Sequence, residues 1–339
     1  MSAYTIMKER RPSIKDVAQK ANVSIATVSH VLNKTRYVSD ETTQRVMNAM
    51  VEVNYHSNAV AKALRQNKTH TVGVIIPDIV NPFFSNLVNY IEMELNKFGY
   101  TVILCHSRDN LEQELACVKK LNSWSVDGII IAPASPDYDY AELREREAQC
   151  PIVFVDRQPN TSNYNGVFFD IYRIFEEATA KLIDAGHRKI GFVHGPIRFS
   201  TTGDRLRGYE SALALNGIPV DQKVIFCADT SIAGGYRAME QLMSNTDMTA
   251  VIVANSRMCL GAMRYLGEKQ VRIPEDLAII GFETTEWADI VQPALTSIRE
   301  TVDEMGISAA KLMMKILRNP DCEKQQIYLN PYLTKKTSY

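Results

Sequence analysis

The pattern of apolar and polar positions changes near residue 70. Before it, apolar residues recur three or four positions apart in short segments, such as Val46, Met50 and Val53 after Ser39, and this spacing is typical of short helices. After it, short, continuously apolar runs alternate with longer segments of helical spacing. The pattern therefore predicts a small all-α unit followed by a larger α/β unit.

Three short helices are predicted in the first unit. Ser13 can cap a first helix, which ends before a tight turn at Asn22, a residue that tolerates left-handed backbone geometry. Ser24 can cap a second helix over 25–32, and a third helix follows Ser39. Two short helices joined by a tight turn and followed by a third helix form a helix-turn-helix.

The second helix has one apolar and one polar face. Its apolar residues Val28 and Leu32 should pack on the other two helices, which exposes Ile25, Ala26, Ser29, His30 and Asn33. Such a face can enter the major groove of DNA, where His30 can donate to guanine N7 or O6 and Ile25 and Ala26 can contact thymine methyl groups. The side chains suited to phosphate contacts are Ser24, Thr27, Ser29, Asn33 and Tyr37. Taken singly, each residue could equally be an ordinary polar surface residue.

The segment between residues 55 and 70 contains neither Gly nor Pro and favours a helix over about 58–65. A helix this short does not persist alone in water. Val60 and Leu64 share one face, and Arg65 can contact phosphates. Paired copies across a dimer axis could press Leu64 into the minor groove and kink a flexible pyrimidine–purine step. A polar linker is the alternative interpretation.

Charge separates the two units further. The whole chain has a formal net charge of −1, but residues 1–70 hold 11 basic and 5 acidic side chains, or +6, and residues 71–339 hold 27 and 34, or −7. A basic head on an acidic body is expected of a nucleic-acid-binding protein, because neutralising phosphates releases counterions. An ordinary solvated basic surface would have the same charge.

The composition indicates a globular protein and gives no sign of a membrane span or a disulfide framework. With 339 residues, 45% hydrophobic and 23% charged, the chain is typical of a globular protein with two or three domains. The sequence has no apolar run of about 20 residues, and its first residues lack the apolar core of a signal peptide, so we expect a cytoplasmic protein. The six cysteines lie 12 or more residues apart without a CxxC pair, so we expect no disulfide framework, metal site or cofactor.

From residue 71 the chain alternates predicted strands with predicted helices in two similar sets. The strands are 72–77, 101–105, 128–133 and 152–156, then 190–196, 250–255 and 277–282; the helices include 84–98, 111–124, 207–216, 235–243 and 259–269. This alternation predicts two doubly wound α/β lobes with parallel sheets. Ligands of such sheets bind outside the carboxyl ends of the strands, so the loops there should line a cleft between the lobes.

No GxSxG elbow, phosphate-binding loop, HExxH or GxGxxG motif occurs in the chain, and His194 is a lone histidine at a predicted strand end. Together with the complete helix-turn-helix head, the absence of these motifs predicts a regulator rather than an enzyme. The alternative is a cytoplasmic α/β enzyme or small-molecule-binding protein whose basic head does not recognise an operator.

The head resembles the LacI/GalR family of bacterial transcription regulators in three stretches: SIKDVA at 13–18, VSIATVSHVLN at 23–33 and VSDET at 38–42. The pair Ser29-His30 is similar to the purine-repressor branch. The resemblance implies that Ile25, Ala26 and His30 read bases. It also implies that NAVAKALR at 58–65 is a hinge helix whose leucine intercalates at a central CpG step.

The resemblance extends over the core, with matching stretches such as IPDIVNPFF at 76–84 and Arg205-Leu-Arg-Gly-Tyr. It implies a periplasmic-binding-protein-like fold in a homodimer, a repressor of pseudo-palindromic double-stranded DNA operators controlled by a small-molecule effector. The implied domains are a head at 1–57, a hinge at 58–70 and a core at 71–335. Its N-lobe takes about 71–169 and 297–325 and its C-lobe about 170–296 and 326–335, with chain crossings near Asp170, Thr296 and Gln326.

The resemblance also implies an effector pocket lined by Asn81, Phe83, Phe84, Asp156, Phe169, Arg205, Thr230, Asn255 and Glu283. The Arg205 guanidinium can bind vicinal hydroxyls or a carboxylate, and the phenylalanines offer a stacking face or are simply core. The chain departs from the family pattern at Ile171, Phe199, Ser256, Glu283 and Glu300. The pocket therefore does not resemble the purine branch, and its two carboxylates favour a hydroxyl-rich effector such as a sugar derivative over a purine or an anion.

Overall fold

The computed structural model describes residues 12–33, 36–55, 68–143, 147–282 and 285–339. By its internal contacts the chain divides into two units, residues 1–69 and 70–339. Most of the predicted hinge lies at 56–67, outside the described residues.

The first unit contains three helices close to the predicted bounds: α1 (Ile14–Lys20), α2 (Ile25–Asn33) and α3 (Asp40–Glu52). The predicted caps of the second and third helices are confirmed: the Ser24 hydroxyl accepts from the Thr27 N–H at 3.0 Å, and the Ser39 hydroxyl accepts from the Thr42 N–H at 3.4 Å. Asn22 has a φ of 53°, so the turn between α1 and α2 uses the left-handed conformation that asparagine tolerates.

One valine from each helix forms the centre of the head. Val17, Val28 and Val46 are fully buried, and Leu32 packs against them at the edge of the cluster. The apolar face of α2 is therefore used inside the head, as predicted, and its opposite face points outward.

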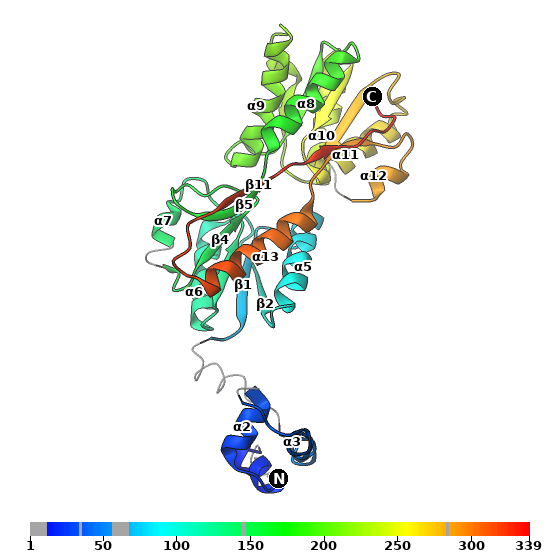
Figure 1. The fold of residues 1–339 in the computed structure, drawn as a ribbon. Coiled ribbons are helices and arrows are strands. Elements are labelled where there is room, and N and C mark those ends of the chain that lie inside the picture. The colour runs from blue at the N-terminus through cyan, green and yellow to red at the C-terminus, as the bar shows by residue number, and fades with distance from the viewer. Residues whose placement is uncertain (1–11, 34–35, 56–67, 144–146, 283–284) are drawn as a thin grey trace, which may run out of the picture. The chain divides into compact units, whose positions relative to one another are not determined.

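The N-lobe of the second unit is built on a parallel sheet with the strand order β11-β5-β4-β3-β1-β2. Its strands within the described ranges are β1 (Thr71–Ile76), β2 (Thr101–His106), β3 (Gly128–Ile131), β4 (Ile152–Val155), β5 (Asn165–Phe169) and β11 (Gln326–Leu329). Helices α5 (Pro82–Asn96) and α13 (Val302–Arg318) pack together on one face (Figure 1). The other face is covered by α6 (Leu111–Ser123) and the short α7 (Tyr140–Glu142).

The C-lobe repeats this plan with the strand order β12-β10-β9-β8-β6-β7, parallel except for β12. Its strands are β6 (Ile190–His194), β7 (Ile225–Cys227), β8 (Ala250–Val253), β9 (Ala278–Phe282), β10 (Thr296–Arg299) and β12 (Tyr332–Leu333). Helices α8 (Ile171–Asp184) and α9 (Ser200–Leu215) cover one face, α10 (Ile232–Asn245) and α11 (Ser256–Glu268) the other, and α12 (Trp287–Ile290) is a short turn of helix. The predicted two doubly wound lobes are confirmed.

Two predicted lobe boundaries need correction. Residues 296–299 are β10, which pairs with β9 in the C-lobe, so the second crossing follows Arg299 instead of preceding Ser297. Residues 326–329 are β11, which pairs with β5 in the N-lobe, so the third crossing follows Leu329 (Figure 1). The C-lobe also extends beyond residue 335, because the Ile279 N–H donates to the Ser338 carbonyl. An apolar run predicts a strand but does not say which sheet the strand joins.

Helices α10 and α11 cross at two glycines that face the partner backbone. An added Cβ on Gly261 would lie 1.9 Å from the Ile232 carbonyl oxygen, and one on Gly235 would lie 2.1 Å from the Met258 carbonyl oxygen. We expect Gly261→Ala to force the helices apart and to destabilise the protein by about 1–3 kcal/mol. Urea unfolding of the purified variant measures this loss.

Gly267→Ala in the same helix is the matched control, because a Cβ there meets no atom within 4 Å. Alanine is the better helix former, so this variant should be as stable as the wild type or more stable. Equal midpoints for the two variants would contradict the close crossing.

Candidate functional site

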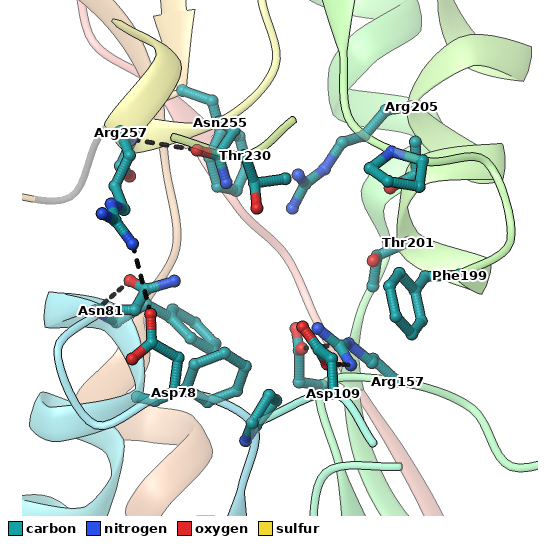
Figure 2. A pocket seen from close by; sticks show the side chains of 18 of the residues that line it. Asp78, Asn81, Asp109, Arg157, Phe199, Thr201, Arg205, Thr230, Asn255 and Arg257 are labelled. Atoms are coloured by element: carbon teal, nitrogen blue, oxygen red, sulfur yellow. Dashed lines mark hydrogen bonds and ion pairs between the residues drawn. The ribbon is translucent and has the colours of Figure 1, made fainter. Parts of the chain in front are cut away.

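A pocket of about 260 Å³ lies between the two lobes, near the lower limit of small-molecule sites. Its residues follow β1, β2 and β4 of the N-lobe and β6 to β10 of the C-lobe, at the carboxyl ends where ligands of parallel sheets bind. Figure 2 shows the side chains of the two lobes facing one another across it. The lining includes Pro77, Asp78, Asn81, Phe83, Phe84, Asp109, Asp156, Arg157, Pro196, Arg198, Phe199, Thr201, Thr202, Arg205, Asp229, Thr230, Asn255, Ser256, Arg257, Phe282 and Glu300.

Seven of the nine residues predicted for an effector pocket are brought together here: Asn81, Phe83, Phe84, Asp156, Arg205, Thr230 and Asn255. Phe169 is not in the lining: it is the last residue of β5, and no residue of that strand lines the pocket. Glu283 lies outside the described residues. Phe83 and Phe84 line the pocket and also belong to the hydrophobic core, with their rings edge to face at 4.9 Å.

Several charged lining residues were not predicted, among them Asp78, Asp109, Arg157 and Arg257. Each comes a few residues after a strand whose carboxyl end faces the cleft. A charged residue a few positions after an apolar run was therefore the sequence signal that could have identified these pocket residues.

Two asparagines are held in place as helix caps. The Asn81 side-chain oxygen accepts from the Phe83 N–H at 3.1 Å, and that of Asn255 accepts from the Arg257 N–H at 3.0 Å. With its oxygen fixed at a helix start, each side chain can present its NH₂ group to a ligand.

Arg205 lies in α9, which begins at Ser200, seven residues earlier than predicted. One of its terminal nitrogens donates to the Ala254 carbonyl at 2.7 Å, and its guanidinium lies 4.1 Å from the centroid of the Phe282 ring. The buried Nε of Arg205 has no hydrogen-bond acceptor in the protein. Oε1 of Glu300, also buried, has no hydrogen-bond donor. The pocket therefore offers one buried donor and one buried acceptor to a ligand or to water.

Burial raises the pKa of Asp156, and Arg157 and Arg205 oppose the shift. Burial also raises the pKa of Glu300 to about 8, with Arg205 opposing the shift and Asp156 adding to it. The pKa of Arg205 is lowered by burial, against the influence of Glu300 and Asp156, but remains that of a charged group. The pocket therefore holds the permanently charged guanidinium of Arg205 next to the carboxyls of Asp156 and Glu300, whose protonation depends on their surroundings.

Arg157 organises the N-lobe side of the pocket. Its guanidinium bonds to the Asp109 carboxylate and donates to the Pro133 carbonyl at 3.1 Å, and its Nε lies 3.7 Å from Asp156. Asp156 itself has a φ of 64°, so the chain bends sharply at the end of β4 and turns both side chains toward the cleft.

Three contacts bridge the lobes around the pocket. Arg257 of the C-lobe pairs with Asp78 of the N-lobe at 3.4 Å. The Arg157 guanidinium stacks 3.8 Å from the centroid of the Phe199 ring, and the N–H of the next residue, Gln158, donates to Ser200 at 3.2 Å. Lobe closure and pocket shape are therefore linked through residues that line the pocket.

The outward face of α2 is the candidate DNA-binding surface. Ile25 is 45% exposed and Ala26 is exposed, whereas Thr27, Ser29 and His30 are half-buried. Tyr37 is exposed, and Ser24 caps α2, also bonding to the Thr27 hydroxyl at 2.9 Å. The Asn33 side chain and residues Val60, Leu64 and Arg65 lie outside the described residues.

The residues that the structure describes contain no cluster of three or more His, Cys, Asp or Glu side chains suited to a metal ion. Among them there is also no helix with the length and apolar character that a membrane span requires.

Two family profiles match the chain. That of "bacterial regulatory proteins, lacI family" matches residues 13–58, and that of "periplasmic binding proteins and sugar binding domain of LacI family" matches residues 69–336. Together they cover the head and nearly the whole core.

Relatives and solved structures agree over the full length. The transcriptional repressor PurR of Photobacterium profundum is 32% identical, covering 96% of this chain and 98% of its own. The ribose operon repressor of Escherichia coli K12 is also 32% identical, covering 96% and 99%. A lac repressor dimer bound to operator and the anti-inducer ONPF superposes with a TM-score of 0.87 at 26% identity, covering 97% and 99%.

Proposed function

The chain belongs to the LacI family of bacterial regulatory proteins, and we propose that it is a homodimeric repressor whose affinity for operator DNA is set by a small hydroxyl-rich ligand between the lobes of its core. It is a transcription regulator and not an enzyme. As such it acts in the cytoplasm, where its DNA lies.

The observation that carries the proposal is that one chain contains both a candidate DNA-binding surface and a candidate effector pocket. The outward face of α2 is small and polar, as a major-groove reader requires, and the interlobe pocket has buried polar atoms that a ligand can satisfy. Ligand binding that favours one lobe arrangement shifts the population between two states of the core, and a head tied to the core responds.

The pocket supports a sugar-like effector in preference to a purine. Arg205 can hold two neighbouring hydroxyls, Phe83 offers an aromatic face, and the Asn81 and Asn255 amides add donors. The carboxyls of Asp156 and Glu300 beside them disfavour a carboxylate or phosphate on the ligand.

A thermal-shift screen of the full-length protein against sugars, sugar acids, sugar phosphates and nucleobases tests this proposal. A neutral or cationic polyol should raise the melting temperature and change operator affinity in a gel-shift titration, which also gives the sign of regulation. Tight binding of guanine or hypoxanthine in calorimetry would overturn the sugar-like assignment.

At the DNA surface, His30→Ala should relax the preference at one base position of the operator by about 1–3 kcal/mol. The reason is that the imidazole donates to a guanine edge, which no other base presents in the same way. Selection of binding sites from random duplex DNA, with wild type and variant in parallel, measures the preference position by position.

Ser29→Ala on the same helix is the comparison, because Ser29 is proposed to contact a phosphate. It should weaken binding evenly over all sequences. An even loss for His30→Ala as well would make His30 a phosphate contact instead of a base reader.

A further inference from the structure

The charged residues of the pocket form a solvated set and a buried set. In the solvated set, Asp78 pairs with Arg257, and Asp229 pairs with Arg237 at 2.5 Å. Arg198 is exposed and stacks 4.6 Å from an aromatic ring centroid. These charges are compensated or screened by water and contribute little to selectivity.

The buried set, together with Asp109, whose side chain is 36% exposed, holds more carboxyls than guanidiniums. Arg157 bonds to Asp109 and lies near Asp156, which leaves Arg205 as the cation that faces both Asp156 and Glu300. The three carboxyls and two guanidiniums would together have a charge of −1 if all were ionised.

Glu300 is the buried carboxyl of this set in which one oxygen has no hydrogen-bond donor. It is 7% exposed, and its Oε1 accepts no hydrogen bond. Burial destabilises a carboxylate whose oxygen lacks a donor, so the protonated form of Glu300 is favoured at pH 7. The groups that face it, Arg205 from α9 and Asp156 after β4, shift its pKa in opposite directions, and burial raises the pKa to about 8.

We propose that the effector is a polyhydroxylated amine, such as an amino sugar, and that Glu300 is the residue that selects its ammonium group. The inference deepens the function proposed above and rests on it. The ammonium donates to Oε1 of Glu300, and the ligand hydroxyls bond to Arg205 and Asp156. The Glu300 carboxyl gives its proton to solvent, and a carboxylate–ammonium pair replaces the neutral acid in the pocket.

A neutral sugar gives a different result. It leaves the proton on Glu300, so binding is not accompanied by proton release and no carboxylate–ammonium pair forms in the pocket. The two ligand types are therefore distinguished by affinity and by proton count.

Calorimetry of the full-length protein at pH 7 tests the proposal with three matched pairs: glucosamine and glucose, galactosamine and galactose, mannosamine and mannose. We expect at least one amino sugar to bind about 10- to 100-fold more tightly than its parent sugar. Repeating the titration in phosphate and in HEPES, which differ in ionisation enthalpy, should show release of close to one proton for the amino sugar and none for the parent.

Variants assign the preference to Glu300. Glu300→Gln cannot carry a negative charge and should lose most of the preference for the amine and the proton release, while Glu300→Asp should retain both. Glu304→Gln removes the same charge from an exposed residue four positions away and should behave as the wild type.

The outcomes separate this inference from the proposed function. If neutral sugars bind as tightly as amino sugars, or if no amino sugar binds, the amine selectivity is wrong. A neutral sugar that binds more tightly than every amino sugar tested and changes operator affinity would overturn it while leaving the proposed function intact. Retained amine preference in Glu300→Gln would show that another carboxyl makes the selection.

Discussion

Replacing Arg205 by alanine should weaken effector binding by on the order of 100-fold or more and abolish the response of operator binding to the effector. Arg205 is the fixed cation of the pocket, held by the Ala254 carbonyl and the Phe282 ring with its Nε still unbonded. Removing one side of a buried, charged hydrogen-bonded pair typically costs about 2–5 kcal/mol. Calorimetry with the ligand found in the screen measures the loss.

The variant should still fold and bind operator. Without Arg205, Asp156 and Glu300 lose their shared cation, but both already have raised pKa values and can remain protonated. Arg205→Lys is the matched comparison: it keeps the charge but not the planar pair of donors, so it should bind more weakly than the wild type. An affinity for Arg205→Ala within about threefold of wild type would exclude Arg205 from the ligand site.

The second large effect is expected at Leu64, which lies outside the described residues and is proposed to wedge into the minor groove. Leu64→Ala should weaken operator binding by roughly 100-fold, because the inserted leucine offsets the cost of unstacking the kinked base step, which is a few kcal/mol. Effector affinity should not change. Gel-shift titration on an operator selected from random DNA measures the operator affinity, and calorimetry measures the effector affinity.

As a control, Gln66→Ala, which replaces a polar residue just after this segment, should bind operator like the wild type. The loss at Leu64 should also depend on the central step of the operator, because a stiff A-tract resists kinking more than a pyrimidine–purine step. If Leu64→Ala bound operator unchanged, the segment 58–65 would be a linker and not a hinge helix.

Features that depend on neighbouring residues could be predicted from the sequence. The capping serines Ser24 and Ser39, the left-handed Asn22 and the buried Val28 follow from local geometry and from the helical period. The parallel strands follow from continuous apolar runs. The head and the α/β character of the core were therefore determined by the sequence.

Features that depend on distant residues were decided by the tertiary structure. Chain order does not say that β10 pairs with β9 or β11 with β5, since all are short strands of similar character. Phe169 was predicted by the same rule as Phe83 and Phe84, yet it ends β5, and no residue of that strand lines the pocket.

The pocket shows the same division. The sequence by itself determined that this chain has a regulator's head, a two-lobed core and a pocket at the strand ends. Only the tertiary structure brought Glu300 to Arg205, which lies 95 positions earlier in the chain, and stacked Arg157 of one lobe on Phe199 of the other. The physical reason is that burial and charge compensation depend on everything packed around a group, and these neighbours come from separate parts of the chain.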